Sequence, residues 1–241
     1  MNRCKEQNAL PKMASALARI DGERQLILTE DGLYVRQVAG GHLELFAALE
    51  ADNPVTRSND ARVHPSGTFW LGTMGRQAEQ GAGAIYALQG GRITRLYPGI
   101  TIPNAICFSP AGDVGYFADT ATNVLHRVPL DPATGLPTGE PIDLIRRQGS
   151  GGLDGAVVDA DGMIWNARWG GGCVDVYDPS GRHLRSLKVP ARQSSCPGRT
   201  WMRRSAPLIP DTVKPSCSMP RHAAVPSPTS SCPDCGLWPP C

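Results

Sequence analysis

Short runs of apolar residues separated by turn residues dominate the first 195 positions of the chain. Residues 26–29 (Leu-Ile-Leu-Thr) are followed by a Glu-Asp-Gly turn and by residues 33–35 (Leu-Tyr-Val), a pattern typical of a β-hairpin. Similar units recur at 84–91 and at 174–181. Because no window shows a sustained helical period, the pattern predicts an all-β chain built from short hairpins.

Three segments of the chain resemble one another when their turn glycines are aligned. They cover residues 59–67, 104–112 and 154–162. Each begins with Asn or Asp, continues through a short apolar strand, turns at a glycine eight positions later and resumes with an aromatic residue. The spacings of 45 and 50 residues between the segments are typical of four-stranded propeller blades.

The first residues of these segments are Asn59, Asn104 and Asp154. In a propeller, equivalent positions on successive innermost strands converge on the central channel, so we expect the three side chains to lie together. Two explanations are open for them. They cap turns, as Asn and Asp commonly do, or they supply oxygen ligands to a hard cation such as Ca²⁺ or Mg²⁺.

The charge balance excludes two classes of partner. The chain carries 24 basic and 22 acidic residues, a net charge of +2, whereas nucleic-acid binding and polybasic membrane binding need concentrated positive charge. No run of 18 apolar residues is present to span a membrane, and no apolar segment follows the first residues as in a signal peptide. We therefore expect a cytoplasmic protein that binds neither nucleic acid nor membrane.

The last 46 residues differ in composition from the rest. They hold five of the eight cysteines and ten of the 22 prolines, with only two glycines. Such a segment buries too little apolar area to offset its ordering entropy. Cys232 and Cys235 form a lone Cys-x-x-Cys pair, which lacks the second pair or the histidines that a zinc site needs.

Three blocks of sequence resemble a known family. They are Asn59-Asp60 with residues 67–74 (GTFWLGTM), residues 103–110 (PNAICFSP), and Asp154-Gly155 with residues 165–172 (WNARWGGG). Together they resemble the family of senescence marker protein (regucalcin), gluconolactonase and luciferin-regenerating enzyme, over roughly residues 14–196. The resemblance implies a six-bladed β-propeller that holds one divalent cation in its central channel.

Carried over by position, the resemblance assigns roles to five residues. Asn104 and Asp154 become metal ligands, Asn59 lies beside metal and substrate, and Arg57 binds substrate oxygens. Glu79 is a further substrate-facing candidate, in a loop whose length differs from the family's. The implied cation is Ca²⁺, with Zn²⁺, Mg²⁺ and Mn²⁺ as alternatives.

The reaction implied by the resemblance is hydrolysis of a sugar lactone such as gluconolactone. A cation held by hard oxygen ligands polarises the lactone carbonyl and activates a water molecule, and Asp154 serves as the catalytic base. Sugar lactone is then the small-molecule partner, and the oligomeric state stays open.

The chain also departs from the family pattern. The family's metal-binding glutamate near the N-terminus has no match, because Glu6 and Glu30 both lack its context. We expect residues 1–13 to be a leader foreign to the family and residues 14–196 to hold about four of six blades. An incomplete propeller leaves sheet edges and apolar faces unpaired. A calcium-binding regulatory protein of the regucalcin type without turnover, and an inactive truncated fragment, are therefore alternatives to the enzyme.

Residues 197–241 are expected to be either a disordered natural tail or an out-of-frame translation. The family continues with a Gly-Gly-Pro-Asp-Leu-Asp segment after about residue 196, where this chain has Gly198-Arg199-Thr200-Trp201-Met202-Arg203. Shifting the reading frame so that each codon begins on the third base of the old one permits Asp-Leu-Asp at this place.

Several other residues are expected to have structural roles. His64, at a strand-to-turn position, is predicted to be exposed rather than a ligand. Trp70, Trp165 and Trp169 are predicted to pack in the core, and Cys107 to be a small buried apolar residue. The three glycines 170–172 are predicted to form a bulge or a tight hairpin turn.

Overall fold

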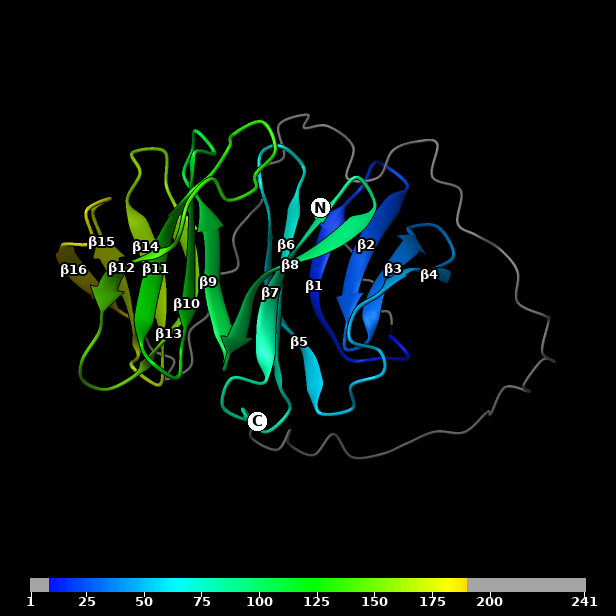
Figure 1. The fold of residues 1–241 in the computed structure, drawn as a ribbon, viewed down its shortest axis with the longest axis horizontal. Helices are drawn as coiled ribbons and strands as arrows, with labels where there is room; N and C mark the ends of the chain where they lie inside the picture. Colours follow the sequence, from blue (N-terminus) through cyan, green and yellow to red (C-terminus); the bar gives the residue numbers. More distant parts are fainter. Residues whose placement is uncertain (1–8, 190–241) are drawn as a thin grey trace, which may run out of the picture.

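The computed structural model describes residues 9–189 of the chain, and within them it contains sixteen β-strands and no helix (Figure 1). The strands are β1 (Ala14–Arg19), β2 (Arg24–Thr29), β3 (Gly32–Gln37), β4 (Leu43–Ala48), β5 (Thr56–Val63), β6 (Phe69–Gly75), β7 (Gly83–Gln89), β8 (Arg92–Ile100), β9 (Pro103–Phe108), β10 (Val114–Asp119), β11 (Val124–Pro129), β12 (Ile142–Arg146), β13 (Gly152–Val158), β14 (Ile164–Trp169), β15 (Cys173–Tyr177) and β16 (His183–Lys188). The predicted all-β class is confirmed. None of the described residues forms a helix that could cross a membrane.

The strands form four antiparallel sheets, each made of four consecutive strands. The first sheet contains β1–β4, the second β5–β8, the third β9–β12 and the fourth β13–β16, always in chain order. Figure 1 shows the sheets side by side, from β1–β4 in blue to β13–β16 in yellow. The chain therefore completes one sheet before it begins the next, which is the connectivity predicted from the repeat of 45 to 50 residues.

Local sequence explains the hairpins. In the predicted hairpin of β2 and β3, Leu28 pairs with Leu33, and the hydroxyl of Thr29 donates to the Gly32 carbonyl at 2.9 Å across the turn. The three repeated turns contain Gly67, Gly112 and Gly162, whose φ angles are 96°, 74° and 81°. Because side chains disfavour this left-handed backbone conformation, glycine at these positions fixes the turns between the first two strands of three sheets.

The first strand of each sheet lies next to the first strand of the following sheet, β1 beside β5, β5 beside β9 and β9 beside β13. Apolar side chains fill the three interfaces between sheets. The buried clusters are Leu26, Leu28, Phe69 and Leu71 between the first and second sheets, Trp70, Ile85, Phe108 and Phe117 between the second and third, and Cys107, Leu125, Leu153 and Ile164 between the third and fourth.

All four first strands carry an irregularity near their N-terminal end. The pairing shifts between Ala14 and Ala16 in β1, between Ser58 and Ala61 in β5, and between Leu153 and Ala156 in β13. In β9 the pairing passes from Asn104–Ala118 to Cys107–Tyr116, and Ala105 has a φ of 56°. Such bulges re-aim side chains, and here they do so at the same end of four neighbouring strands.

The burial of His64 and Trp169 differs from the prediction, and that of Trp70 agrees with it. The side chain of His64, expected to be exposed, is only 1% exposed, because its ring packs edge-on against Phe108 and its Nε2 contacts the Gly112 carbonyl at 2.8 Å. Trp70 is fully buried as predicted, but Trp169 is 45% exposed, since it stands at the end of β14 where the chain turns.

Other expectations agree with the structure or lie outside it. Cys107 is buried, and residues 170–172 form the tight turn between β14 and β15. Of the expected leader, residues 9–13 are described, and Lys12 forms an ion pair with Asp31. The expected tail, residues 197–241, lies outside the described residues.

Candidate active site

Asn59, Asn104 and Asp154 lie in the N-terminal halves of β5, β9 and β13, where the bulges occur. Each strand begins a sheet, and neighbouring first strands contact one another, so the three positions stand on adjacent strands at one end of the array. Bulges at these positions turn residues away from the regular alternation of a strand. The repeat in the sequence thus identifies equivalent positions on the first strands of three successive sheets.

Asn59 connects the second sheet to the third. Its Nδ2 donates to the Pro103 carbonyl at 2.9 Å and contacts Asn104 Oδ1 at 3.3 Å. Arg57 Nη1 donates to Asn59 Oδ1 at 3.2 Å and to the Ser58 carbonyl at 3.0 Å. Three of the five predicted site residues, Arg57, Asn59 and Asn104, therefore form one chain of hydrogen bonds.

Asn104 is held from its other side by the third sheet. Its side chain is nearly buried, with 9% of the residue exposed, and its Nδ2 donates to Thr120 Oγ1 at 2.9 Å. Thr120 in turn donates to the Leu153 carbonyl at 2.6 Å. Leu153 directly precedes Asp154, so this relay links the strands that carry the two predicted metal ligands.

Asp154 is half-buried, and burial raises the pKa of its carboxyl above the usual range, while a hydrogen bond from the Gly155 amide opposes the shift. The backbone around it is fixed by the fully buried Asn166, whose Nδ2 donates to the Asp154 carbonyl at 2.7 Å. A carboxylate with a raised pKa is a stronger base than an ordinary one, which suits proton transfer near neutral pH.

Asp60 and Arg62 lie on the same strand as Asn59 and bond to neighbouring first strands, and the sequence predicted no role for either of them. Asp60 Oδ2 accepts a hydrogen bond from the Ile106 amide at 2.9 Å. Burial raises the pKa of Asp60 to about 6, and the charge of Asp154 adds to the effect. The signal that could have identified Asp60 is its position directly after Asn59, within the same bulge.

Arg62 joins three first strands. Its Nε donates to the Ile106 carbonyl of β9 at 3.2 Å, and its Nη2 donates to the Ala156 carbonyl of β13 at 2.9 Å. Both acceptors belong to strands other than its own, β5. In the sequence, Arg62 is a basic residue two positions after Asp60 in a predicted strand. Nothing in that pattern indicated its bonds to two other strands.

Glu79 makes a local contact rather than a bond to another predicted site residue. It lies in the connection between β6 and β7, and its Oε2 accepts a hydrogen bond from the Gln77 amide at 3.0 Å. The structure therefore places the Glu79 carboxylate against its own loop.

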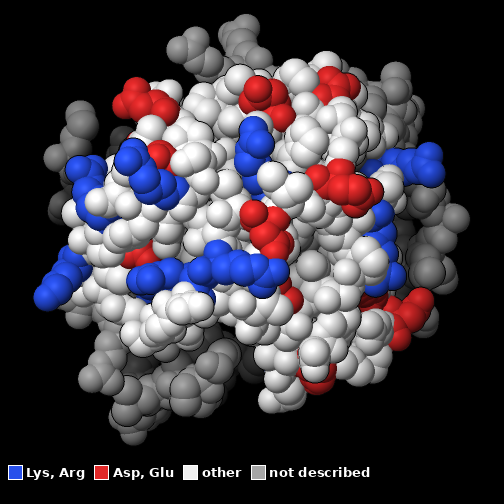
Figure 2. Space-filling model, turned by 60° about the vertical axis from the view of Figure 1, so that its left-hand side comes forward, with Lys and Arg blue, Asp and Glu red and all other residues white. Residues whose placement is uncertain are grey.

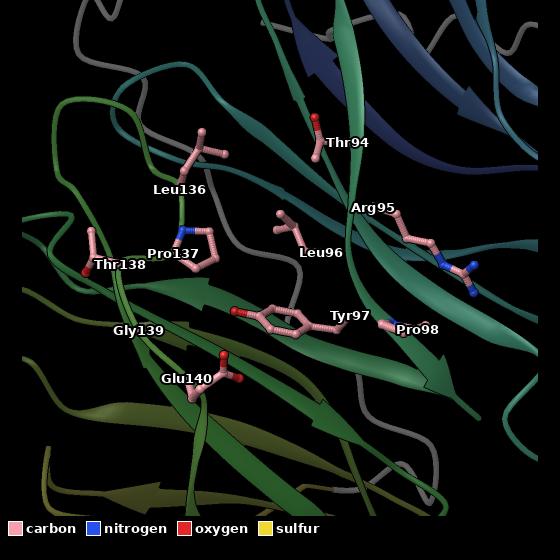
Figure 3. Close-up of a pocket in the computed structure, with 10 residues that line it drawn as sticks. All are labelled: Thr94, Arg95, Leu96, Tyr97, Pro98, Leu136, Pro137, Thr138, Gly139 and Glu140. Carbon is pink, nitrogen blue, oxygen red and sulfur yellow. The ribbon is translucent and has the colours of Figure 1, made fainter.

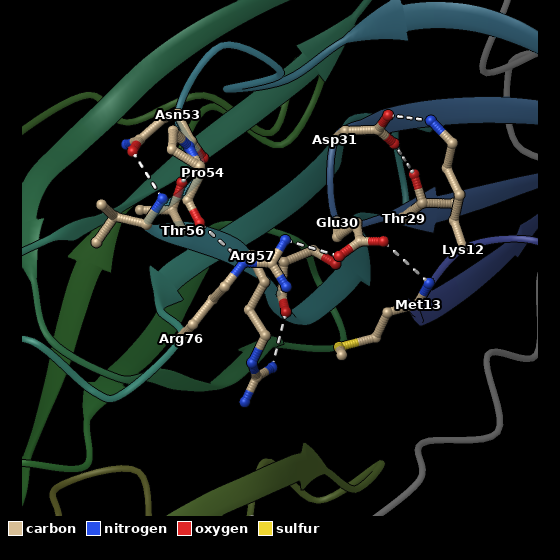
Figure 4. A network of polar contacts seen from close by, with 12 residues as sticks. Lys12, Met13, Thr29, Glu30, Asp31, Asn53, Pro54, Thr56, Arg57 and Arg76 are labelled. Carbon is tan, nitrogen blue, oxygen red and sulfur yellow. Dashed lines mark hydrogen bonds and ion pairs between the residues drawn. The ribbon is translucent and has the colours of Figure 1, made fainter.

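The loops beside the site form a second polar network (Figure 4). Arg76 donates to Glu30 Oε2 at 2.7 Å and to the Pro54 carbonyl at 3.0 Å, which ties the β6–β7 connection to the first sheet. Arg76 lowers the pKa of Glu30 below its ordinary value. Glu30 is thus engaged in a contact between sheets.

Two of the predicted site residues carry oxygen atoms of the type that binds hard divalent cations. Asn104 Oδ1 and the Asp154 carboxylate are oxygen donors of the kind that Ca²⁺ and Mg²⁺ prefer. The described part of the chain contains no group of three or more His, Cys, Asp or Glu side chains placed to hold a metal ion. By donor type the two oxygens suit such a cation, and they would fill only a minority of the six to eight positions around Ca²⁺.

A cavity lined by none of the predicted site residues lies beside the second sheet (Figure 3). It has a volume of about 660 Å³ and lies between the outermost strand β8 and residues 136–140 of the third sheet. Figure 3 shows Tyr97 extending toward Glu140, while Arg95 points to the other side.

On the face shown in Figure 2, basic and acidic side chains lie side by side.

The comparisons with known proteins agree on one family. The model of the SMP-30/Gluconolactonase/LRE-like region matches residues 1–198. A putative sugar lactone lactonase of Rhizobium meliloti is 57% identical over 189 residues, which are 78% of this chain and 64% of that protein. A pentonolactonase of Haloferax volcanii is 32% identical over 187 residues, 76% of this chain and 62% of the relative.

A solved structure extends the comparison to the fold. The crystal structure of a calcium-binding protein, regucalcin, from Agrobacterium tumefaciens matches with a TM-score of 0.77 and 56% identity, covering 78% of this chain and 64% of that one. The chain thus spans somewhat less than two thirds of the length of these relatives.

Proposed function

The chain belongs to the SMP-30/gluconolactonase/LRE-like family, and from this premise we propose that its site serves divalent-metal-dependent hydrolysis of a sugar lactone. Relatives named as lactonases support the reaction class. The observation that carries the proposal is the hydrogen-bonded chain Arg57–Asn59–Asn104, continued through Thr120 to the strand of Asp154. It joins a guanidinium and two amide groups and ends at the carbonyl of the residue that precedes Asp154.

In this proposal, Arg57 and Asn59 bind the sugar. A guanidinium carries five N–H donors, and the Nη1 atom of Arg57 is already oriented by Ser58 and Asn59. The other N–H groups of Arg57 donate to hydroxyl oxygens of the substrate. This fixes the lactone carbonyl near Asp154 and supplies the orientation on which much of catalysis depends. Glu79 joins the substrate site when its carboxylate leaves the Gln77 amide.

Asn104 Oδ1 and the Asp154 carboxylate would hold the cation, which we propose is Ca²⁺. When bound, the cation supplies Lewis-acid polarisation of the lactone carbonyl. Asp154 accepts a proton from water as the water oxygen forms its bond to the carbonyl carbon. The bond between the carbonyl carbon and the ring oxygen breaks, and Asp154 returns the proton to that oxygen, which leaves a hydroxy acid.

The finer architecture is part of the same proposal. We expect the four sheets to be part of a six-bladed propeller. The regucalcin relative, described as calcium-binding, favours a second candidate function in which the same oxygen ligands bind Ca²⁺ without turnover. The two functions share the cation site and differ in whether acid is released.

Release of acid from gluconolactone by the full chain, followed in a pH-stat with and without Ca²⁺, tests the proposal. We expect metal-dependent hydrolysis that Asp154→Asn reduces at least about 100-fold, the scale of general base catalysis. Asp161→Asn, in the exposed turn of the same sheet, is the matched control and should retain activity. Calcium binding without acid release would favour the regulatory function, and equal rates for Asp154→Asn and the unaltered chain would refute the role of Asp154.

A further inference from the structure

The two ends of the Asn104 amide make different contacts. Nδ2 donates to Thr120 Oγ1 at 2.9 Å, and Oδ1 faces Asn59 Nδ2 at 3.3 Å. Only the oxygen of an amide can bind a cation, so the function proposed above needs one of the two orientations of this side chain.

The hydroxyl of Thr120 selects that orientation. A hydroxyl has one proton, and Thr120 donates it to the Leu153 carbonyl at 2.6 Å. Toward Asn104, Thr120 is therefore left with acceptor lone pairs only. Turning the amide by 180° would place Asn104 Oδ1 against an oxygen without a proton, and Nδ2 against the NH₂ group of Asn59. Both contacts would be repulsive.

We propose that Thr120 is a positioning residue: its hydroxyl, oriented by the Leu153 carbonyl, fixes the Asn104 amide so that Oδ1 is presented to the candidate cation site. This inference rests on the proposed function for its purpose, but the orientation of the amide is a property of the metal-free chain. Partners that orient metal ligands in this way commonly change metal affinity about 10- to 100-fold when removed.

The surroundings of Thr120 hold it in place. Its backbone amide donates to the Ile102 carbonyl at 3.0 Å, just before β9 begins. A Cβ atom on Gly152 would lie 2.5 Å from Thr120 Cγ2, so the absence of a side chain at Gly152 lets the threonine methyl group approach β13.

The same turn also fixes the other peptide group of Leu153. Asn123 Oδ1 accepts from the Leu153 amide at 2.9 Å, and Asn123 has a φ of 54°. Thr120 and Asn123 together hold both the N–H and the C=O of the residue before Asp154. The turn between β10 and β11 thus orients Asn104 directly and the strand of Asp154 through its backbone.

Nuclear magnetic resonance of the full chain without metal tests the orientation. The Asn104 side-chain NH₂ signals are assigned by their loss in Asn104→Asp. In Thr120→Val, which keeps the shape and removes the hydroxyl, we expect these signals to move and to exchange faster with water. Thr120→Ser should restore them. Thr122→Val is the control, because within the described part of the chain the Thr122 hydroxyl bonds only the Asp119 carbonyl of the same turn, at 3.2 Å.

Calcium titration of the same variants provides the second arm. We expect Thr120→Val to weaken binding about 10-fold, with Thr120→Ser and Thr122→Val near the unaltered chain. If Thr120→Val does not fold, Thr120→Ala replaces it in both arms.

Unchanged Asn104 signals in Thr120→Val, or signals that Thr120→Ser fails to restore, would overturn the positioning role. If instead the signals respond as expected but the unaltered chain binds no calcium, the proposed function fails while the role of Thr120 in orienting Asn104 stands. The two failures are therefore distinguishable.

Discussion

Arg57 and Arg62 stand five residues apart on β5, and the structure predicts opposite consequences for their replacement. Both side chains are half-buried. Arg62 bonds carbonyls of two other sheets, those of Ile106 and Ala156, whereas Arg57 bonds, among residues 9–189, only Ser58 and Asn59 of its own strand. Methionine at either position keeps most of the aliphatic stem and removes the charge.

Arg62→Met should lower the free energy of unfolding by about 2 kcal/mol. Each charge-assisted hydrogen bond contributes about 1.5–3 kcal/mol, and the partial exposure of Arg62 lets water replace part of that amount. For a chain of this length, such a loss lowers the melting temperature by about 4–8 °C. Arg57→Met should change stability by less than about 0.5 kcal/mol and should instead raise KM for the lactone about 10-fold, through loss of a charged contact to substrate.

Urea unfolding followed by tryptophan fluorescence measures the first effect, and initial rates against lactone concentration measure the second. A loss of stability below about 0.5 kcal/mol in Arg62→Met would refute the role of Arg62 as a link between sheets. Equal destabilisation by both variants would show that the distinction between bonds within and between strands is wrong.

Three further predictions follow from single residues. Burial lowers the pKa of His64 in the folded chain, so as the pH falls below about 6.5 the unfolded chain takes up a proton on this residue before the folded chain does. The free energy of unfolding then falls by at most about 1.4 kcal/mol per pH unit. When melting is compared at pH 7.5 and 5.5, this loss should be smaller in His64→Gln than in the unaltered chain. Gly83→Ala should unfold the second sheet, because its Cβ would lie 1.8 Å from the Thr73 carbonyl oxygen, and circular dichroism would record lost strand signal. Glu79→Gln should leave the melting temperature unchanged and raise KM if Glu79 contacts substrate, and an unchanged KM would remove it from the site.

The sequence predicted the all-β class, and its repeat marked residues that lie on the first strands of three successive sheets, Asn59, Asn104 and Asp154. Both depend on a local pattern that recurs: a turn glycine and a polar residue eight positions before it. It did not predict the burial of His64, which depends on a partner 48 positions away, the carbonyl of Gly112. Contacts of that kind carry no periodic signal.

The same reason explains the missed site residues. Thr120 lies in a turn outside the three repeats, and its role arises from contacts with Asn104 and Leu153, which reach it from two different strands. Arg62 resembles any charged strand residue until Ile106 and Ala156 are brought beside it. Repeats thus identify equivalent positions, whereas the groups that orient them emerge only when the sheets are assembled.

The central claim is that Asn104 and Asp154 together hold a divalent cation, and calorimetric titration of the full chain with Ca²⁺ tests it most directly. The account predicts one ion bound per chain and loss of the binding heat in Asp154→Ala, with the heat retained in the control Asp161→Ala. Absence of binding by the unaltered chain, or an unchanged isotherm in Asp154→Ala, would contradict it.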